Sequence, residues 1–143
     1  MTASQVERLI IQAELSEARN TAHIRSRIFG YDFDPKDGSI VVVEHEAEII
    51  FSVIEQLATI TFLSCSRLLE DIAKEFRLAS PQVRTRSQRL FTPKTLAQLC
   101  KPIYASLELN MWGTYSKVSN YPRIVSEKSY RTAIARLKRE SLA

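Results

Sequence analysis

The first segment of the chain places apolar residues at the spacing of an α-helix. Four of them recur at i, i+3, i+4 and i+7, namely Val6, Leu9, Ile10 and Ala13. Ser4 and Glu7 have the spacing of a capping box, which is typical of a helix N-terminus. Because Gly30 is a stop signal, we expect a helix from residue 4 to about residue 28.

Residues 29–39 are rich in turn-forming residues and predict a loop. Three carboxylates precede Gly38 there: Asp32, Asp34 and Asp37. They superficially match a calcium-binding loop, but Lys36 stands where a third ligand belongs. The twelfth position would be Val43 rather than Glu, so we expect no calcium site.

The stretch from Ile40 to Leu78 contains neither Pro nor Gly and has apolar residues three to four apart, which predicts a long core helix. Its first four residues are β-branched and equally predict a short strand. A single helix over residues 40–78 would be about 58 Å long, whereas a globule of this length is about 37 Å across. The helix must therefore start late, bend, or project into a second copy of the chain.

Two pairs of residues in the second half predict helix starts, because each places a capping side chain before a proline. Ser80–Pro81 opens a short basic helix over 81–91, and Thr92–Pro93 opens a longer one over 93–110. Pro102 lies inside the second helix and predicts a kink or break.

Two further segments near the C-terminus predict helices. Residues 114–118 form a short one, and Ser126 caps a last helix that reaches about Glu140. Trp112 and Tyr115 are expected to close the core under this last helix, with stacking on bases as the alternative. The fold class expected from all these segments is all-α, a bundle of about five helices with a long central helix and at most one short β element.

Basic and acidic side chains are unevenly distributed along the 143 residues. Residues 1–79 carry 8 basic and 13 acidic side chains, whereas residues 80–143 carry 12 basic and 3 acidic ones. A segment of one charge attracts a polyanion, because each neutralised phosphate releases condensed counterions. We therefore expect an acidic helical core or dimerisation region, 1–79, and a basic helical region, 80–143, with one single domain as the alternative.

The last predicted helix has two distinct faces. Its apolar face holds Tyr130, Ala133, Ile134 and Leu137. Its opposite face holds Lys128, Arg131, Thr132, Ala135 and Arg139. A Ser-capped helix that ends in Leu137-Lys138-Arg139 resembles the second helix of helix-turn-helix or winged-helix regulators, over about 30 residues.

The resemblance implies a helix-turn-helix-like C-terminal part that enters the major groove of DNA. Lys128, Arg131 and Thr132 would then lie at base edges. The residues expected at phosphates are Arg123, Arg136, Lys138, Arg139, Arg84, Arg86 and Arg89. The alternative is an amphipathic helix that docks on its own bundle and exposes a basic face to solvent.

Motifs that carry catalysis are absent from the sequence. Three glycines form no phosphate-binding loop, and neither His23 nor His45 has a metal-ligand partner at i+4. Cys65 and Cys100 have no metal spacing and are expected as small core residues. We therefore expect no enzyme, no cofactor and no metal.

Composition narrows the class of protein further. The chain is 45% apolar and 25% charged, which is typical of a globular domain, and no apolar run is long enough to cross a bilayer. The N-terminus lacks the pattern of a signal peptide, and two cysteines form no disulfide framework. We expect a cytoplasmic protein, at the nucleoid or in the nucleus when it binds DNA, without membrane association.

Two functions follow from these patterns. The first is a small regulatory protein that binds nucleic acid, with DNA favoured over RNA, through its basic C-terminal half. The second is a non-catalytic helical interaction or assembly subunit that binds a partner protein or self-associates. Both functions are compatible with a homo-oligomer.

Overall fold

The structure is a computed structural model that describes residues 28–118 and 120–143. The helix expected over residues 4–28 lies outside the described residues, apart from its last position. The chain divides into two compact units, with the boundary between Ala47 and Glu48. The expected acidic 1–79 and basic 80–143 regions concern charge along the chain, and that division stays a prediction.

The described part of the first unit is a β-hairpin. Strand β1 (Tyr31–Phe33) pairs antiparallel with strand β2 (Ile40–Val42). The carboxylates of Asp34 and Asp37 accept hydrogen bonds from the backbone N–H groups of Lys36 and Ser39, each at 2.9 Å. These two carboxylates therefore stabilise the turn, and the short strand considered for Ile40–Val43 is confirmed over its first three residues.

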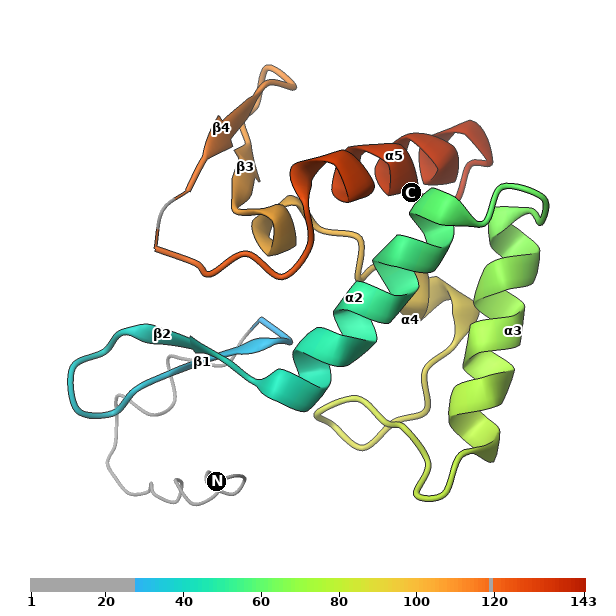
Figure 1. The fold of residues 1–143 in the computed structure, drawn as a ribbon, viewed down its shortest axis with the longest axis horizontal. Helices are drawn as coiled ribbons and strands as arrows, with labels where there is room; N and C mark the ends of the chain where they lie inside the picture. The colour runs from blue at the N-terminus through green and yellow to red at the C-terminus, as the bar shows by residue number, and fades with distance from the viewer. Residues whose placement is uncertain (1–27, 119) are drawn as a thin grey trace. The chain divides into compact units, whose positions relative to one another are not determined.

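The long core helix expected within residues 40–78 is two separate helices in the structure. Helix α2 (Glu44–Thr59) and helix α3 (Cys65–Leu78) are separated by residues 60–64 (Figure 1). Ser64 explains the restart, because its hydroxyl accepts a hydrogen bond from the N–H of Arg67 and caps α3. The helical region therefore starts late and the chain bends, two of the outcomes that the length argument allows.

The basic helix expected over 81–91 is also wrong. Residues 80–92 form a loop that is closed by a bridge between Arg84 and Leu90. Gln88 adopts a left-handed conformation with φ 66°, and its N–H donates to the carbonyl of Thr85 at 2.9 Å. This local turn replaces the helical hydrogen bonds that the proline signal predicted.

The helix expected over 93–110 is much shorter in the structure. Helix α4 (Pro93–Ala97) has the predicted cap, because the side chains and backbones of Thr92 and Thr95 form a reciprocal capping box. A 3₁₀-helix, η2 (Pro102–Ala105), follows, so the break predicted at Pro102 is confirmed. Ser106 then turns the chain with a left-handed φ of 57° into a strand.

A second β-hairpin replaces the helix expected over 114–118. Strand β3 (Leu107–Leu109) pairs antiparallel with strand β4 (Tyr115–Lys117), with Leu107 opposite Lys117 and Leu109 opposite Tyr115. Because the described residues contain two small antiparallel sheets, the fold is mixed α/β and the all-α bundle of five helices is wrong.

Helix α5 (Glu127–Arg139) agrees with the sequence. The hydroxyl of Ser126 accepts a hydrogen bond from the N–H of Ser129, which confirms the predicted cap. The element just before α5 is the β3–β4 hairpin rather than a helix (Figure 1), so the helix-turn-helix-like part of the expected fold is wrong. The side chains fully buried in the second unit include Leu57, Cys65, Leu69, Leu96, Tyr104, Tyr130 and Leu137.

The described helices are of moderate length and carry both apolar and charged side chains. Over residues 28–118 and 120–143, none is long and apolar enough to span a bilayer.

Candidate nucleic-acid interface

Helix α5 exposes the face that the sequence assigned to DNA. Its buried side chains are Tyr130, Ala133, Arg136 and Leu137, and three of these four are apolar. The opposite face, which we call the basic face, consists of Lys128, Arg131, Thr132, Ala135 and Arg139, all exposed. Thr132 and Ala135 are short, so the backbone of the helix can approach a ligand between the longer cationic side chains.

Contacts at the N-terminal end of α5 fix the position of Arg131. Its Nε donates to the carboxylate of Glu127 at 2.7 Å, and its guanidinium lies 4.5 Å from the ring centroid of Tyr115. The Arg131 hydrogen bond lowers the pKa of Glu127, so this carboxylate is ionised at neutral pH. Lys117 adds a longer ion pair with Glu127 at 3.7 Å. Two cations therefore surround the single carboxylate of this helix turn.

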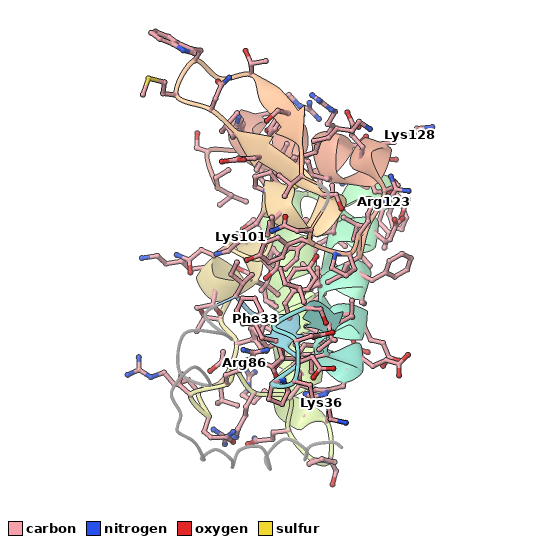
Figure 2. All side chains as sticks on the ribbon, turned by 90° about the vertical axis from the view of Figure 1, so that its left-hand side faces the viewer. Phe33, Lys36, Arg86, Lys101, Arg123 and Lys128 are labelled. Carbon is pink, nitrogen blue, oxygen red and sulfur yellow. The ribbon has the colours of Figure 1, made fainter. Side chains whose placement is uncertain are left out.

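The loop before α5 adds another cation to the same region. Arg123 is exposed in this loop, three positions before the cap residue Ser126, and Figure 2 shows it below Lys128. Lys138 and Arg139 are exposed at the C-terminal end of the helix. Five of the residues predicted at phosphates or bases therefore lie along one helix and the loop that leads into it: Arg123, Lys128, Arg131, Lys138 and Arg139.

Arg136 does not belong to this surface, which corrects its predicted phosphate contact. Its residue exposure is only 7%. The guanidinium donates to the carbonyl oxygens of Leu57 at 2.6 Å, Ile60 at 2.7 Å and Leu63 at 2.7 Å. These carbonyls belong to the end of α2 and the linker after it, where a helix leaves acceptors without partners. Arg136 therefore stabilises the turn between α2 and α3.

The positions of Arg136 and the basic face on a helical wheel already differ. At about 100° per residue, Arg136 and Lys138 both lie about 80° from Lys128, but on opposite sides of it, and Arg136 is on the edge of α5 that also carries Glu140. The carboxylate of Glu140 accepts hydrogen bonds from the N–H of Cys65 at 2.9 and 3.2 Å, at the start of α3. This edge of α5 thus places the cation of Arg136 at the C-terminal end of α2 and the anion of Glu140 at the N-terminal end of α3. Helix dipoles favour both positions.

The remaining predicted residues lie at a different place in the second unit. Arg84, Arg86 and Arg89 belong to the loop between α3 and α4, well away from α5 (Figure 1). Arg84 is engaged within this loop, because its Nη1 donates to the carbonyl of Gln88 at 2.9 Å and its Nη2 bonds the side chain of Gln82. The structure therefore separates these three arginines from the basic face.

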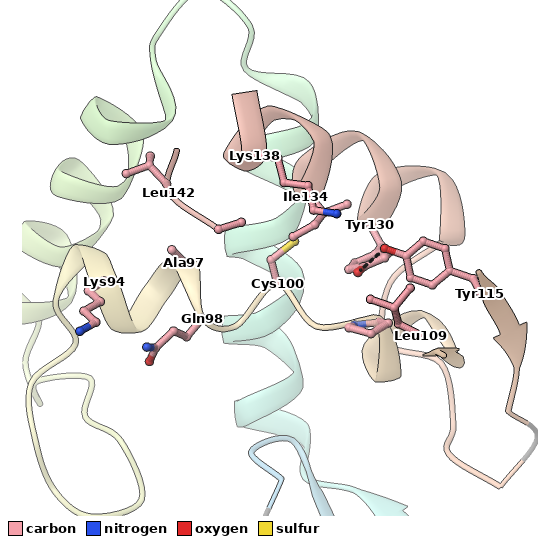
Figure 3. A pocket seen from close by; sticks show the side chains of 12 residues that line it. Lys94, Ala97, Gln98, Cys100, Leu109, Tyr115, Tyr130, Ile134, Lys138 and Leu142 are labelled. Carbon is pink, nitrogen blue, oxygen red and sulfur yellow. Dashed lines mark hydrogen bonds between the residues drawn. The ribbon is translucent and has the colours of Figure 1, made fainter. Parts of the chain in front are cut away.

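A pocket of about 440 Å³ lies between α4, α5 and the β3–β4 hairpin (Figure 3). Its walls are mainly apolar, and Lys94 and Lys138 stand at its rim. Burial raises the pKa of the Cys100 thiol to about 12, so this thiol is protonated at neutral pH. The hydroxyls of Tyr115 and Tyr130 lie 3.0 Å apart, and burial raises the pKa of Tyr130. The Cys100 thiol and the Tyr130 phenol of this pocket are therefore protonated at neutral pH.

Of the two aromatic residues that the sequence predicts in the core here, Tyr115 packs under α5 and Trp112 does not. Tyr115 packs edge-on against Tyr130, with ring centroids 5.8 Å apart, as expected of a core aromatic. Trp112 was expected in the core as well, but it is 81% exposed, and the neighbouring Met111 is 86% exposed. The turn sequence Asn110-Met111-Trp112-Gly113 was the available signal, because Asn and Gly at these positions favour a hairpin turn over a helix end.

Metal ligands are not clustered in the part of the chain that is described. No group of three His, Cys, Asp or Glu side chains there is placed to hold a metal ion. Comparison of the chain with models of protein families, with characterised proteins and with solved structures finds no match. The site must therefore be interpreted from its own geometry and charge.

Proposed function

We propose that this protein binds nucleic acid, duplex DNA in particular, through the basic face of α5 and the loop before it. The observation that carries the proposal is the exposure of Lys128, Arg131 and Arg139 along one face of a helix whose opposite face is buried. Cations at this spacing can contact successive phosphates, and the short side chains between them leave room for base edges.

The surroundings of this face support an anionic partner. Of the three carboxylates in residues 80–143, Glu127 is bound by Arg131 and Lys117, and Glu140 is bound to the N-terminus of α3. The carboxylates of Glu127 and Glu140 are thus bound within the protein. Lys128 and Arg139 of the basic face extend to solvent, whereas Arg131 is partly exposed and paired with Glu127. This imbalance raises the local concentration of a polyanion.

The experiment is a titration of a labelled random duplex with protein, followed by fluorescence anisotropy at about 50 to 200 mM salt. Lys128→Ala is compared with Lys74→Ala, which removes the same charge from an exposed helical position on α3. We expect Lys128→Ala to weaken binding several-fold and to reduce the salt slope by about 1, with little effect of Lys74→Ala. Equal affinities for the two variants would contradict the proposal.

The proposal also assigns a compartment. A DNA-binding protein works in the cytoplasm at the nucleoid, or in the nucleus. Cys65 and Cys100 are both buried and free, which suits a reducing interior.

A second candidate function is that of an interaction or assembly subunit, and exposed apolar side chains favour it. Phe51 on α2, Phe62 in the linker to α3, and Leu78 at the end of α3 are 50%, 84% and 69% exposed. Exposed groups of this kind are typical of surfaces that bind a partner protein or a second copy. Light scattering tests this function, because it predicts a molar mass above the monomer value without nucleic acid.

A further inference from the structure

The pocket between α4, α5 and the β3–β4 hairpin has the size and the walls of a small-molecule site. Its volume of about 440 Å³ lies within the range of about 300 to 1,000 Å³ that is common for such sites. Apolar side chains from α4, β3, α5 and the residues after α5 line it, namely Ala97, Leu109, Ile134 and Leu142. Walls of this kind favour an apolar ligand, because burial of the two apolar surfaces releases water.

The polar groups inside these walls are uncharged and have partners. The hydroxyls of Tyr115 and Tyr130 lie 3.0 Å apart and form a hydrogen bond with each other. Burial raises the pKa of the Cys100 thiol to about 12, so the thiol carries no charge at neutral pH. The inner wall therefore suits the hydrocarbon part of a ligand.

The residues after α5 close one side of the pocket through a defined turn. The N–H of Leu142 donates to the carbonyl of Leu137 at 2.7 Å, and the N–H of Ser141 donates to the carbonyl of Lys138 at 3.1 Å. Ser141 has a left-handed φ of 60°. These features form a Schellman motif, which turns the chain back at the end of the helix. The motif places Leu142 in the wall of the pocket.

The charged side chains of the pocket are cationic. Lys94 on α4 and Lys138 on α5 line it, and both residues are exposed. No Asp or Glu side chain among the described residues lines this pocket. A main-chain carboxylate at Ala143, the last of the 143 residues, offsets at most one of the two lysines. An excess of positive charge therefore remains at the rim of an apolar pocket.

We propose that this pocket binds a small amphipathic anion, in its simplest form an aliphatic carboxylate, with its chain along the apolar walls and its head group at the lysines. Figure 3 shows the lining side chains spread from Lys94 at one end to Leu109 and Tyr115 at the other, so an extended chain has apolar contacts along its length. The lysines favour a negative head group over a neutral or a positive one. Binding of this ligand does not require nucleic acid.

Three probes with the same alkyl chain and different head-group charges test the proposal: octanoate, 1-octanol and octylammonium. Each is titrated, below the concentration at which it forms micelles, into the isotope-labelled full-length protein while amide chemical shifts are followed by NMR. We expect octanoate to bind about fivefold more tightly than octanol, because an exposed ion pair adds a modest amount of affinity. Octylammonium should bind more weakly than octanol.

The positions of the shifts locate the ligand. The largest changes should occur at Ala97, Ile134 and Leu142, which line this pocket. Ile103 and Val118 line a separate hollow in the same unit and should change little.

A double variant, Lys94→Gln with Lys138→Gln, removes both charges from the rim. Its affinity for octanoate should fall about fivefold, to that of octanol, while its affinity for octanol stays at the wild-type value. The unchanged octanol affinity separates a loss of charge from a loss of folding. Lys36→Gln with Lys74→Gln is the matched control, because it removes two exposed lysines that do not line the pocket and should keep the wild-type affinities.

Four results would overturn the proposal. They are no shift with octanoate, equal affinities for octanoate and octylammonium, an unchanged octanoate affinity in the Lys94→Gln, Lys138→Gln variant, and shifts centred on Ile103 and Val118. Each of them leaves the nucleic-acid proposal standing, because the anisotropy titration tests that proposal separately.

Discussion

Arg136 stabilises the turn between α2 and α3 because its guanidinium donates to three backbone carbonyls there. Removal of this charged donor leaves buried carbonyl acceptors without hydrogen-bond partners. The loss lowers the free energy of unfolding. We expect Arg136→Met to lower the free energy of unfolding by about 2 to 5 kcal/mol.

Urea titration measures this loss. Arg139→Met serves as the control, because Arg139 is exposed three positions later on the same helix and should change the stability by less than about 0.5 kcal/mol. A similar stability for both variants would mean that the three hydrogen bonds of Arg136 contribute little.

Glu140 provides a prediction about pH. The hydrogen bond from the N–H of Cys65 lowers the pKa of this carboxyl below its ordinary value of 4.5. A group whose pKa is lowered in the folded state stabilises the protein above its unfolded pKa, and this contribution is lost as pH falls through the folded pKa. We therefore expect wild type to be more stable than Glu140→Gln at pH 7, with the difference shrinking below about pH 4.5.

Urea titrations of both proteins at pH 7, 5 and 3 test this expectation. A difference in unfolding free energy that is the same at all three pH values would show that the charge of Glu140 is not what stabilises the start of α3.

At the scale of the element, α5 depends on its cap. Ser126 accepts a hydrogen bond from the N–H of Ser129 at 3.1 Å, so Ser126→Ala should cost about 1 kcal/mol of stability. Ser126→Asp keeps an acceptor at the cap and should retain the stability. Thermal unfolding followed by circular dichroism distinguishes the two variants, and an equal loss in both would argue against capping as the cause.

The same Asp variant also tests the position of the proposed interface. Its new negative charge lies beside Lys128 and Glu127, where it opposes a phosphate. We expect Ser126→Asp to bind duplex more weakly than Ser126→Ala although it is the more stable of the two. The opposite order would place the DNA away from the N-terminal end of α5.

The elements also show which local signals are reliable. Ser64 caps the start of α3 inside the region where the sequence predicts one long helix, whereas the caps predicted at Ser126 and Thr92 are confirmed. The Pro81 signal failed because the loop 80–92 satisfies its backbone groups through turns and the Arg84–Leu90 bridge instead of a helix. A cap and a proline predict where a helix can start, but neighbouring hydrogen bonds decide whether it does.

At the scale of the whole molecule, the prediction concerns salt. Five cations belong to the proposed surface: Arg123, Lys128, Arg131, Lys138 and Arg139. Because Arg131 is already paired with Glu127, four cations remain to neutralise phosphates, and the slope of log K against log salt should be about −3 to −4. A slope near −1 would mean that most of these cations do not contact the duplex.

Part of this protein follows from its sequence alone. The capped, two-faced α5, the cap of α4, the break at Pro102 and the basic character of residues 80–143 depend on local spacing and composition, which the sequence contains directly. The tertiary structure decided the rest, because it depends on residues far apart in the chain. Arg136 is buried by carbonyls 73 to 79 positions away. The β3–β4 hairpin leaves Trp112 exposed, while Tyr115 beside the turn meets Tyr130, 15 positions away. The spacing of neighbouring residues does not specify contacts between distant parts of the chain. Only the folded structure therefore distinguishes a cation that binds the protein's own backbone from a cation that is available to a ligand.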